Sequence, residues 1–292
     1  MILVAGSANL DFVVRADHIP APGETVLGHT FRTFAGGKGA NQAVACARAG
    51  GAPTAMLLAL GQDDFAKPLE ASLREAGVQL HVKRSADLPT GTAFICVSDD
   101  AENAITVAPG ANNALLPGDL PHLQGVSHLV MQLETPLDTV TAYARQARAK
   151  GVKVVLNAAP AQVLPAELLQ NLDILIVNEG ELAVVAAHDG SIESCLGRLN
   201  VPCVVVTLGH EGSWARLGGE ITRQAAFAIE PVDTTGAGDT FVGSLVAALS
   251  QDMPMAQALR QANAAGALAC MTPGAQTSIP TMAEVEAFLQ TH

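Results

Sequence analysis

Aromatic residues are scarce in this chain: they make up 3% of its 292 residues, although 49% of the residues are hydrophobic. The core must therefore consist mainly of Ala, Val, Leu and Ile, which suits helices packed closely against a parallel sheet. The chain has enough apolar residues for one large α/β domain or two smaller ones.

Basic residues are also few, with 16 Lys and Arg against 28 Asp and Glu and a formal net charge of −12. This balance provides no basic field that would attract a phosphate backbone or an anionic membrane. We therefore expect neither a nucleic acid nor a membrane as partner. An anionic nucleotide stays possible, because backbone amides, a few cations and Mg²⁺ can bind phosphates locally.

Paired cysteines are missing as well. The five cysteines are odd in number and include no C-x-x-C pair, which argues against a disulfide framework or a zinc knuckle. The apolar run at residues 2–5 is too short for a signal peptide or a membrane span. We expect a cytoplasmic protein.

Several common catalytic motifs are absent. Gly39, not Ser or Thr, follows Lys38, so this Gly-rich segment is not a P-loop. The segment from Gly6 to Asp11 lacks the G-x-G-x-x-G fingerprint, which disfavours a nicotinamide dehydrogenase. The chain also has no G-x-S-x-G or H-E-x-x-H motif, so a hydrolase is disfavoured too.

The chain does contain a regular alternation of two patterns. Short runs rich in Val, Ile and Leu lie at 2–5, 55–60, 127–133, 152–156, 172–177 and 201–207. Segments with helical patterning lie between them, among them 40–49, 64–76, 136–149, 161–170 and 179–188. This order predicts an α/β fold with a central, mostly parallel sheet covered by helices. Two stretches, at about 10–34 and 90–108, break the alternation and predict a small β-sheet lid inserted into a single domain, 1–292.

Polar residues follow several of the predicted strands, among them Asn9, Glu134, Asn157, Asn178 and Thr207. In open α/β sheets, ligands bind beyond the carboxyl ends of the strands. Each residue alone could be an ordinary turn or helix cap. Together they predict a binding site along one edge of the sheet.

The most specific motif is the run from Asp233 to Asp239, Asp-Thr-Thr-Gly-Ala-Gly-Asp, directly before a helical pattern. Its glycines allow close backbone approach, and the first N–H groups of a helix bind anions. Asp239 at this anion hole could accept a proton from an attacking hydroxyl, or it could simply cap the helix. The motif alone leaves both interpretations open.

Three further features could contribute to a binding site. The Gly-rich turn from Ala35 to Asn41 precedes a helix of small residues, and a turn of this kind can also be purely structural. Asn9 and Asp11 carry an amide and a carboxylate that suit two neighbouring hydroxyls. Near Asn178, Glu181 could hold hydrated Mg²⁺, although acids are common in a first helical turn.

Together, Gly36-Gly-Lys-Gly-Ala-Asn41 and Asp233-Thr-Thr-Gly-Ala-Gly-Asp239 resemble the two signatures of the PfkB carbohydrate kinase family, and further motifs make the chain most similar to that family's ribokinases. The resemblance implies a ribokinase-like fold with helices on both faces of the sheet. It also implies phosphorylation of D-ribose at its 5-hydroxyl by ATP, with Asp239 as base and an anion hole formed by Gly236, Ala237 and Gly238.

The resemblance further implies three sets of ligand-binding residues. The sugar would be bound by Asn9, Asp11, Gly37, Lys38, Asn41, Glu134 and Asp239. ATP would be bound by Asn178, Thr207, Gly209, Gly212, Gly238 and Asn263, with Mg²⁺ near Glu181. An activating K⁺ would be held by Asp233, Thr235, Ala269, Thr272, Gly274 and Ser278.

The family likeness also implies a homodimer formed through the lid. Several alternatives to ribose stay open: the same chemistry on fructose, a keto-deoxy sugar acid or a nucleoside, or a sugar or nucleotide sensor without catalysis. An acidic acceptor should need additional cations in the pocket, and the predicted lid offers only Arg15 and Arg32. A nucleoside should need apolar walls, for which Phe12, Phe34 and Phe94 are the candidates.

Overall fold

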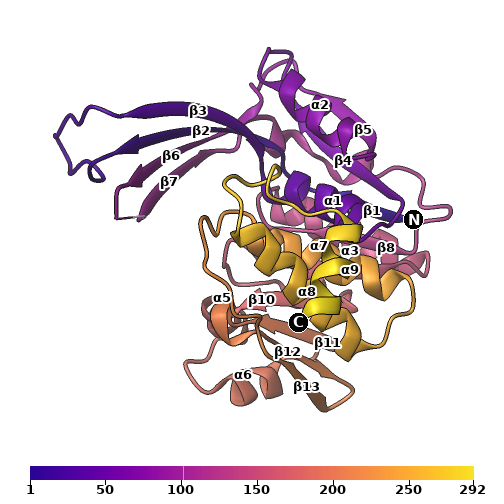
Figure 1. Ribbon diagram of the computed structural model, residues 1–292. Helices are drawn as coiled ribbons and strands as arrows, with labels where there is room; N and C mark the ends of the chain where they lie inside the picture. The colour runs from indigo at the N-terminus through magenta and orange to yellow at the C-terminus, as the bar shows by residue number, and fades with distance from the viewer. Residues whose placement is uncertain (101) are drawn as a thin grey trace.

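The computed structural model describes residues 1–100 and 102–292; residue 101, inside the second predicted insertion, lies outside the described residues. Among the described residues, the main sheet has nine strands in the order β13-β12-β11-β10-β9-β8-β1-β4-β5 (Figure 1). Their bounds are β1 Ile2–Ala5, β4 Thr54–Leu60, β5 Gln79–Arg84, β8 His128–Met131, β9 Lys153–Asn157, β10 Ile174–Asn178, β11 Cys203–Thr207, β12 Ser213–Leu217 and β13 Glu220–Gln224. The seven neighbouring strands β11, β10, β9, β8, β1, β4 and β5 pair in parallel. The hairpin β12–β13 extends the sheet beyond β11 with antiparallel pairing.

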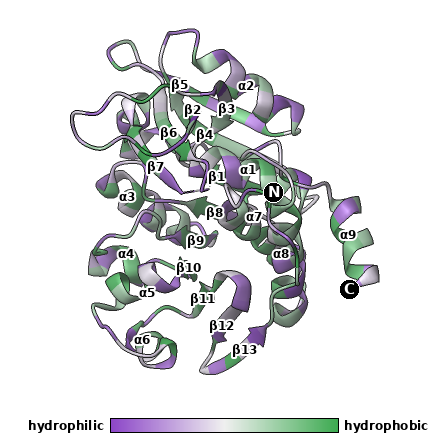
Figure 2. Ribbon diagram, turned by 60° about the vertical axis from the view of Figure 1, so that its left-hand side comes forward, coloured by the Kyte–Doolittle hydropathy of each residue, from purple (hydrophilic) through white to green (hydrophobic). Residues whose placement is uncertain are grey.

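Helices cover both faces of this sheet (Figure 2). One face carries α1 Lys38–Arg48, α2 Ala66–Glu75, α7 Ala237–Ser250, α8 Met255–Cys270 and α9 Met282–Thr291. The other face carries α3 Leu137–Ala149, α4 Ala166–Gln170, α5 Glu179–Ala186 and α6 Ile192–Arg198. Three short 3₁₀ helices lie among the described loops, η1 Gly110–Ala114, η2 Pro117–Asp119 and η3 Gly209–Glu211.

The alternation of side chains along β1 explains why this fold needs a strand that is apolar throughout. Ile2 and Val4 pack into the core on the α1 and α7 side, whereas Leu3 and Ala5 pack into the core beneath α3. All four residues are buried. A strand covered by helices on both faces has no side that contacts solvent, so its sequence is a continuous run of hydrophobic residues.

The predicted α/β fold with a mostly parallel sheet between helices is confirmed. One helix expected over 161–170 was wrong in its first half, because α4 begins only at Ala166. Pro165 directly precedes α4 and Pro160 lies just before the predicted segment. A residue before proline avoids the helical region, which delays the start of the helix.

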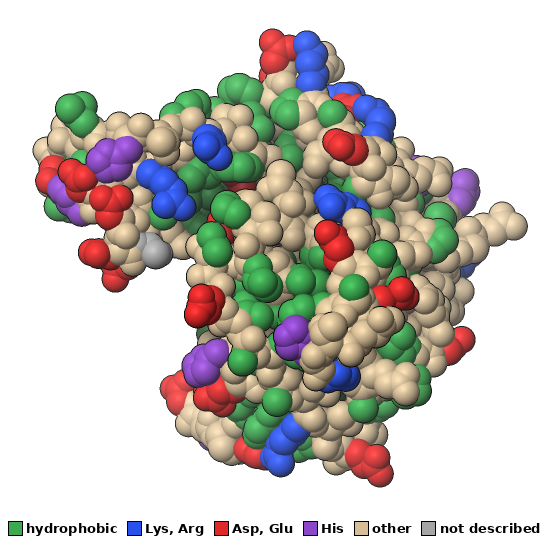
Figure 3. Space-filling view, in the orientation of Figure 1, with side chains coloured by type: hydrophobic (Ala, Val, Ile, Leu, Met, Phe, Trp, Pro, Cys, Tyr) green, Lys and Arg blue, Asp and Glu red, His purple; other side chains and the backbone are tan. Residues whose placement is uncertain are grey.

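The predicted lid is confirmed as a separate four-stranded sheet in the order β3-β2-β6-β7. It consists of β2 Asn9–Ala16, β3 Thr30–Gly36, β6 Gly91–Ser98 and β7 Asn103–Ala108. The lid projects from the body and leaves a concave recess beside it (Figure 3). β2 leaves the end of β1 after three residues, so the lid begins at the edge where we expected ligands.

No described helix combines the length and the apolar character that a membrane span requires.

Candidate active site

A pocket of about 160 Å³ lies where the carboxyl ends of β10 and β11 meet the first turn of α7. It is lined by predicted sugar, nucleotide and catalytic residues that come from distant parts of the chain: Lys38, Asn178, Glu181, Thr207, Gly236, Gly238 and Asp239. The sheet edge predicted from polar strand ends is therefore the edge that carries this pocket.

The first turn of α7 carries the predicted anion hole. Gly236 precedes the helix with a φ of 75°, a left-handed conformation that glycine adopts without strain. Gly236 and Gly238 border the pocket, and the positive end of the helix dipole lies there. The amide of Ala237 instead donates to the carbonyl of Thr234 at 3.2 Å, so this third predicted amide is engaged within the loop.

Asp239 lies in that first turn and is 8% exposed. Its Oδ2 accepts a hydrogen bond from Asn41 Nδ2 at 2.9 Å, and its Oδ1 accepts one from Gln42 Nε2 at 2.9 Å. Both donors belong to α1. Asn41 Oδ1 is buried without a hydrogen-bond partner among the described residues, so it is free to accept a ligand hydroxyl.

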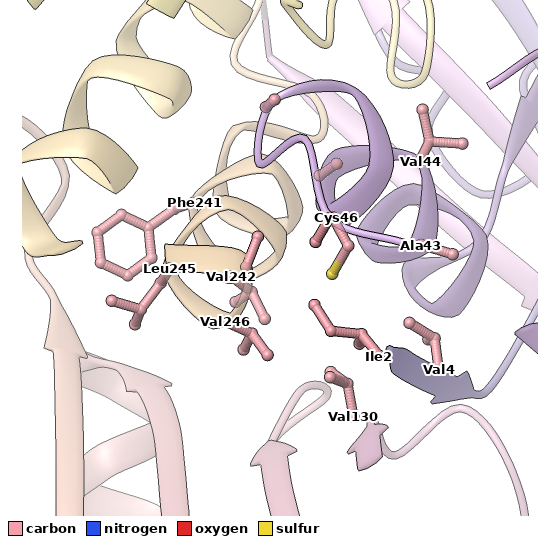
Figure 4. Packing of buried hydrophobic residues seen from close by; sticks show 14 of the residues in the cluster. Ile2, Val4, Ala43, Val44, Cys46, Val130, Phe241, Val242, Leu245 and Val246 are labelled. Atoms are coloured by element: carbon pink, nitrogen blue, oxygen red, sulfur yellow. The ribbon is translucent and has the colours of Figure 1, made fainter. Parts of the chain in front are cut away.

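Small residues bring α1 and α7 close enough for these contacts. A Cβ on Gly243 would lie 2.7 Å from the carbonyl oxygen of Gln42 and would overlap the side chain of Ala45. Figure 4 shows Val242 and Val246 of α7 beside Cys46 of α1, above Ile2 and Val130 of the sheet. This close crossing determines the position of Asp239 relative to the start of α1.

The Gly-rich turn before α1 allows a second close approach. A Cβ on Gly39 would come within 2.6 Å of the backbone nitrogen of Ser7 and 2.7 Å of the carbonyl carbon of Gly6. Ala40 N donates to Ser7 O at 2.8 Å, and Gly37 has a φ of 89°. The glycines of this motif therefore let α1 dock onto the segment that leaves β1.

Carboxylates surround the expected sugar side of the site. Burial, together with the nearby charges of Glu134 and Asp239, raises the pKa of Asp11 to about 7. Glu134 accepts hydrogen bonds from Ser7 Oγ at 2.5 Å and from Lys38 N at 3.1 Å. Asp239 raises the pKa of Lys38, and Glu134 and Glu181 add to this effect, so the Lys38 ammonium stays charged among three acids.

Asn9 is oriented by a residue whose contact the sequence did not predict. Asn112 Nδ2 donates to Asn9 Oδ1 at 2.7 Å, while Asn112 Oδ1 accepts from the amide of Ala8 at 3.0 Å. Asn9 and Asn112 are both buried. With its oxygen already engaged, Asn9 presents its amide N–H groups to a ligand.

On the nucleotide side, Asn178 and Glu181 cap α5 reciprocally. Glu181 N donates to Asn178 Oδ1 and Asn178 N donates to Glu181 Oε2, each at 2.8 Å. Burial raises the pKa of Glu181. Gly209, Gly212 and Asn263 lie outside the 160 Å³ pocket. Asn263 donates to the carbonyls of Gln224 and Ala225 at 3.3 Å, at the end of β13.

Asp233 joins the two loops of the predicted cation site. Its carboxylate accepts from Thr235 N and from Gly274 N, each at 2.9 Å. Although burial acts in the opposite direction, these hydrogen bonds hold the pKa of Asp233 below its usual value. Of the other predicted ligands, Ser278 donates from its hydroxyl to Ala275 O at 2.8 Å. Thr272 N donates to Ala269 O at 3.4 Å.

A model of the pfkB family carbohydrate kinases matches residues 1–282. The chain belongs to this family. It is 38% identical to the ribokinase of Haemophilus influenzae over 99% of this chain and 98% of that protein. A crystal structure of the ribokinase from Thermotoga maritima matches with a TM-score of 0.91, 35% identity and 99% of both chains. The structure of Arabidopsis thaliana ribokinase complexed with ribose and ATP also has a TM-score of 0.91, at 34% identity over 99% of this chain and 98% of that one.

The predictions of family and enzyme class are thereby confirmed, and this kinase is a sugar phosphotransferase. Sequence reasoning missed several buried polar residues that support its site, namely Ser7, Gln42, Asn112 and Gln132. Ser7, Asn112 and Gln132 stand in three of the segments that carry the resemblance to ribokinases, which was the available signal. These segments are Gly6-Ser-Ala-Asn-Leu-Asp11, Pro109-Gly-Ala-Asn112 and Met131-Gln-Leu-Glu-Thr-Pro136. Gln42 directly follows Asn41 of the first signature, and its contacts with residues far along the chain could not be read from that position.

Proposed function

We propose that this kinase transfers the γ-phosphoryl group of ATP to the 5-hydroxyl of D-ribose, with Asp239 as catalytic base. The observation that carries the proposal is the position of Asp239. It is a buried carboxylate, hydrogen-bonded on both oxygens, in the first turn of a helix whose glycine amides border the same pocket. The similarity to ribokinases over nearly the whole chain supports ribose as the acceptor.

In the proposed reaction, Asp239 accepts the proton of the 5-hydroxyl while the oxygen of this hydroxyl forms a bond to the γ-phosphorus of ATP. The bond between the γ-phosphorus and the β,γ-bridging oxygen breaks, and ADP leaves with the electron pair of that bond. Because the transferred phosphoryl group is loose and highly charged, positioning and electrostatic stabilisation provide most of the catalysis. The amides of Gly236 and Gly238 provide the donors, and that of Ala237 joins them if its 3.2 Å bond to Thr234 opens.

The sugar side favours a neutral acceptor rich in hydroxyls. Asn9 offers N–H donors, Asn41 offers a free oxygen, and the carboxylates of Asp11 and Glu134 can accept hydrogen bonds from hydroxyls. Gly37 would contribute backbone contacts. The single cation Lys38 faces three carboxylates, so a keto-deoxy sugar acid would meet net repulsion.

Two of the aromatic residues that a nucleoside would need, Phe12 and Phe94, lie on the face of the lid sheet opposite Asp11. Phe12 and Phe94 stack on each other with ring centroids 5.4 Å apart. The Phe34 ring lies 3.5 Å from where a Cβ of Gly274 would stand. These contacts disfavour a nucleoside acceptor, and fructose is the alternative that our assay must separate from ribose.

We propose that ATP binds along the ends of β10 and β11 and beside α8, on Asn178, Thr207, Gly209, Gly212, Gly238 and Asn263. Asn178 and Glu181 border the phosphate end of the pocket and fit hydrated Mg²⁺, since an amide oxygen and a carboxylate are hard oxygen ligands. Bound there, Mg²⁺ would neutralise phosphate charge. Glu181 and Asn178 would hold its water shell in place.

The 232–235 and 269–278 loops fit a monovalent cation such as K⁺. Asp233 carries negative charge, keeps lone pairs on both oxygens and ties the two loops together. Carbonyl or hydroxyl oxygens of Thr235, Ala269, Thr272, Gly274 and Ser278 would complete the shell. Bound there, the cation would stabilise the loop that begins α7 and hence the anion hole.

We also propose that two chains pair through their lids. Phe31, Phe94 and Ile105 are 60%, 54% and 56% exposed, which is unusual for large apolar side chains on one small sheet. Phe31 and Phe94 share one face of the lid sheet, and Ile105 lies on the other face together with Asp11. Pairing that buries the Ile105 face would cover the recess, so that water could not take the phosphoryl group.

The five cysteines are free, which supports the expected reducing, cytoplasmic setting.

The test is release of ADP from Mg-ATP with pentoses, hexoses and nucleosides, each with and without K⁺. We expect ribose to give the highest kcat/KM and K⁺ to increase it. Turnover of another acceptor but not of ribose would refute the acceptor and keep the kinase. Binding of ATP and sugar without any turnover would indicate a sensor instead.

A further inference from the structure

Gln42 is the most buried polar contact of the proposed base. Its side chain is 0% exposed, and it lies in the α1 turn that crosses α7. Gln42 Nε2 donates to Asp239 Oδ1 and to Asn157 Oδ1, both at 2.9 Å. Gln42 Oε1 accepts from Gln132 Nε2 at 2.6 Å. All three neighbours therefore contribute to holding one amide group.

These contacts determine which way the Gln42 amide points. If it were reversed, its oxygen would face the oxygens of Asp239 and Asn157, and its NH₂ group would face the NH₂ group of Gln132. Asn157 cannot relieve this conflict by reversing, because its own Nδ2 donates to Ile176 O at 3.1 Å. The donor of the Gln42 amide is therefore directed at Asp239.

We infer that Gln42 is a positioning residue for the phosphoryl transfer, and that it anchors Asp239 Oδ1 so that Oδ2 receives the proton. Oδ2 lies beside Asn41, whose buried oxygen has no partner among the described residues and is free for the sugar. The relay Gln132, Gln42, Asp239 links the loop after β8 to the reactive carboxylate through side-chain amides alone. This inference rests on the proposed role of Asp239 as base.

The decisive variant is Gln42→Glu, which keeps the shape and replaces the donor with an acid. Two carboxyl groups about 3 Å apart cannot both ionise freely, so they share a proton near neutral pH. We expect kcat at pH 7 to fall roughly 10- to 100-fold. In the pH profile of kcat, the acidic limb, where activity is lost as pH falls, should move to higher pH by about one unit or more. The KM for ATP should change less than about threefold.

The pH comparison isolates position 42 because the other charges that act on Asp239 stay the same. These are Asp11 on β2, Lys38 on α1 and Glu181 on α5. The matched control is Gln261→Leu. Gln261 is a glutamine on α8 that is 4% exposed, and its Nε2 lies 3.5 Å from Ser244 Oγ. This control should lower the melting temperature and leave the acidic limb in place.

If Gln42→Glu folds, as judged by circular dichroism, and its acidic limb coincides with that of the wild type, the inference is overturned. If it does not fold, Gln132→Leu provides the test one step away, with an expected loss of about three- to tenfold in kcat at an unchanged KM for ATP. Full activity of Gln132→Leu would then overturn the inference. Activity of Asp239→Asn would instead refute the proposed function, so the two failures are distinguishable.

Discussion

The floor of the site and the lid above it are built in opposite ways. On the floor, Asp239, Asn41 and Gln42 are buried and joined by hydrogen bonds of 2.9 Å. On the lid, β7 is exposed along its whole length, and the contact of His29 Nε2 with Asp17 Oδ1 at 2.9 Å, between β2 and β3, is open to solvent. An exposed polar contact of this kind contributes little to stability. The floor is therefore held in place by contacts among its own residues, whereas the lid has contacts left to make.

This contrast predicts that the floor and the lid have different roles in the reaction. Catalysis by electrostatic stabilisation needs groups that are held in place before the reaction, which the floor provides. Segments that close over ligands come from the less stable parts of a protein, which describes the lid. Changes in the floor should lower kcat, and changes in the lid should affect sugar affinity and association of chains.

The largest effect should come from Asp239→Asn. The amide keeps the shape of the side chain but cannot accept the hydroxyl proton, so we expect kcat to fall by about 10³- to 10⁴-fold with ATP binding retained. Single-turnover assays and nucleotide titration measure the two quantities. Asp252→Asn, an exposed aspartate after α7, is the control. More than about a tenth of the wild-type kcat would show that another base acts.

Gly243→Ala should break the floor without touching its chemical groups. The added methyl group would stand 2.7 Å from the Gln42 carbonyl oxygen and push α1 from α7. We expect a loss of about 1–3 kcal/mol in the free energy of unfolding and of roughly 10- to 100-fold in kcat. Gly197→Ala is the matched control, because this α6 glycine has nothing within 4 Å of its missing Cβ. Equal behaviour of the two variants in thermal melts and kinetics would contradict the close crossing.

Asp11 connects the floor to the lid, and its pKa of about 7 makes sugar binding depend on pH. The ionised carboxylate is the better acceptor for hydroxyls, so the KM for the sugar should rise roughly tenfold from pH 8 to pH 6. Steady-state kinetics should show this rise in the wild type and lose it in Asp11→Asn. A wild-type KM that stays constant over this range would contradict the shifted pKa.

The same shift predicts the sign of a stability effect. Without sugar, the folded Asp11 holds its proton up to about pH 7, while the unfolded residue loses it near the ordinary aspartate pKa of 3.8. Stability therefore falls as pH rises through this window, and the full penalty applies above pH 7. Asp11→Asn should raise the melting temperature at pH 8 and leave it nearly unchanged at pH 3.5.

The smallest kinetic effects should follow from lid substitutions. Phe94→Asp and Ile105→Asp place a charge on each face of the lid sheet, because Phe94 pairs with Phe12 whereas Ile105 pairs with Ile95. We expect monomers in sedimentation at micromolar concentration, a few-fold higher KM for the sugar and an unchanged kcat in the presence of saturating sugar. Leu217→Asp, at an exposed leucine on β12, is the control. A wild-type chain that sediments as a monomer would refute pairing through the lid.

The sequence was informative where chemistry is local. The buried runs that became β1 and β4 and the two glycine motifs could be recognised because their neighbours in the chain determine their conformation. Gln42 and Gln132 could not be assigned, since their partners lie 197 and 90 residues away along the chain. A polar residue within a helix of small side chains looks the same whether it faces solvent or a buried carboxylate.

β2 starts at the floor and ends at the far side of the lid, with Asn9 and Asp11 at its beginning and Ala16 at its end. A designer who wants a different acceptor can therefore treat one strand as two zones. Libraries that vary Val13, which shares a face of β2 with Asp11, together with the exposed β7 would search the cover of the pocket. Leaving the first three residues of β2, all of α1 and the first turn of α7 intact would preserve the proposed sugar contacts and the proposed base throughout that search.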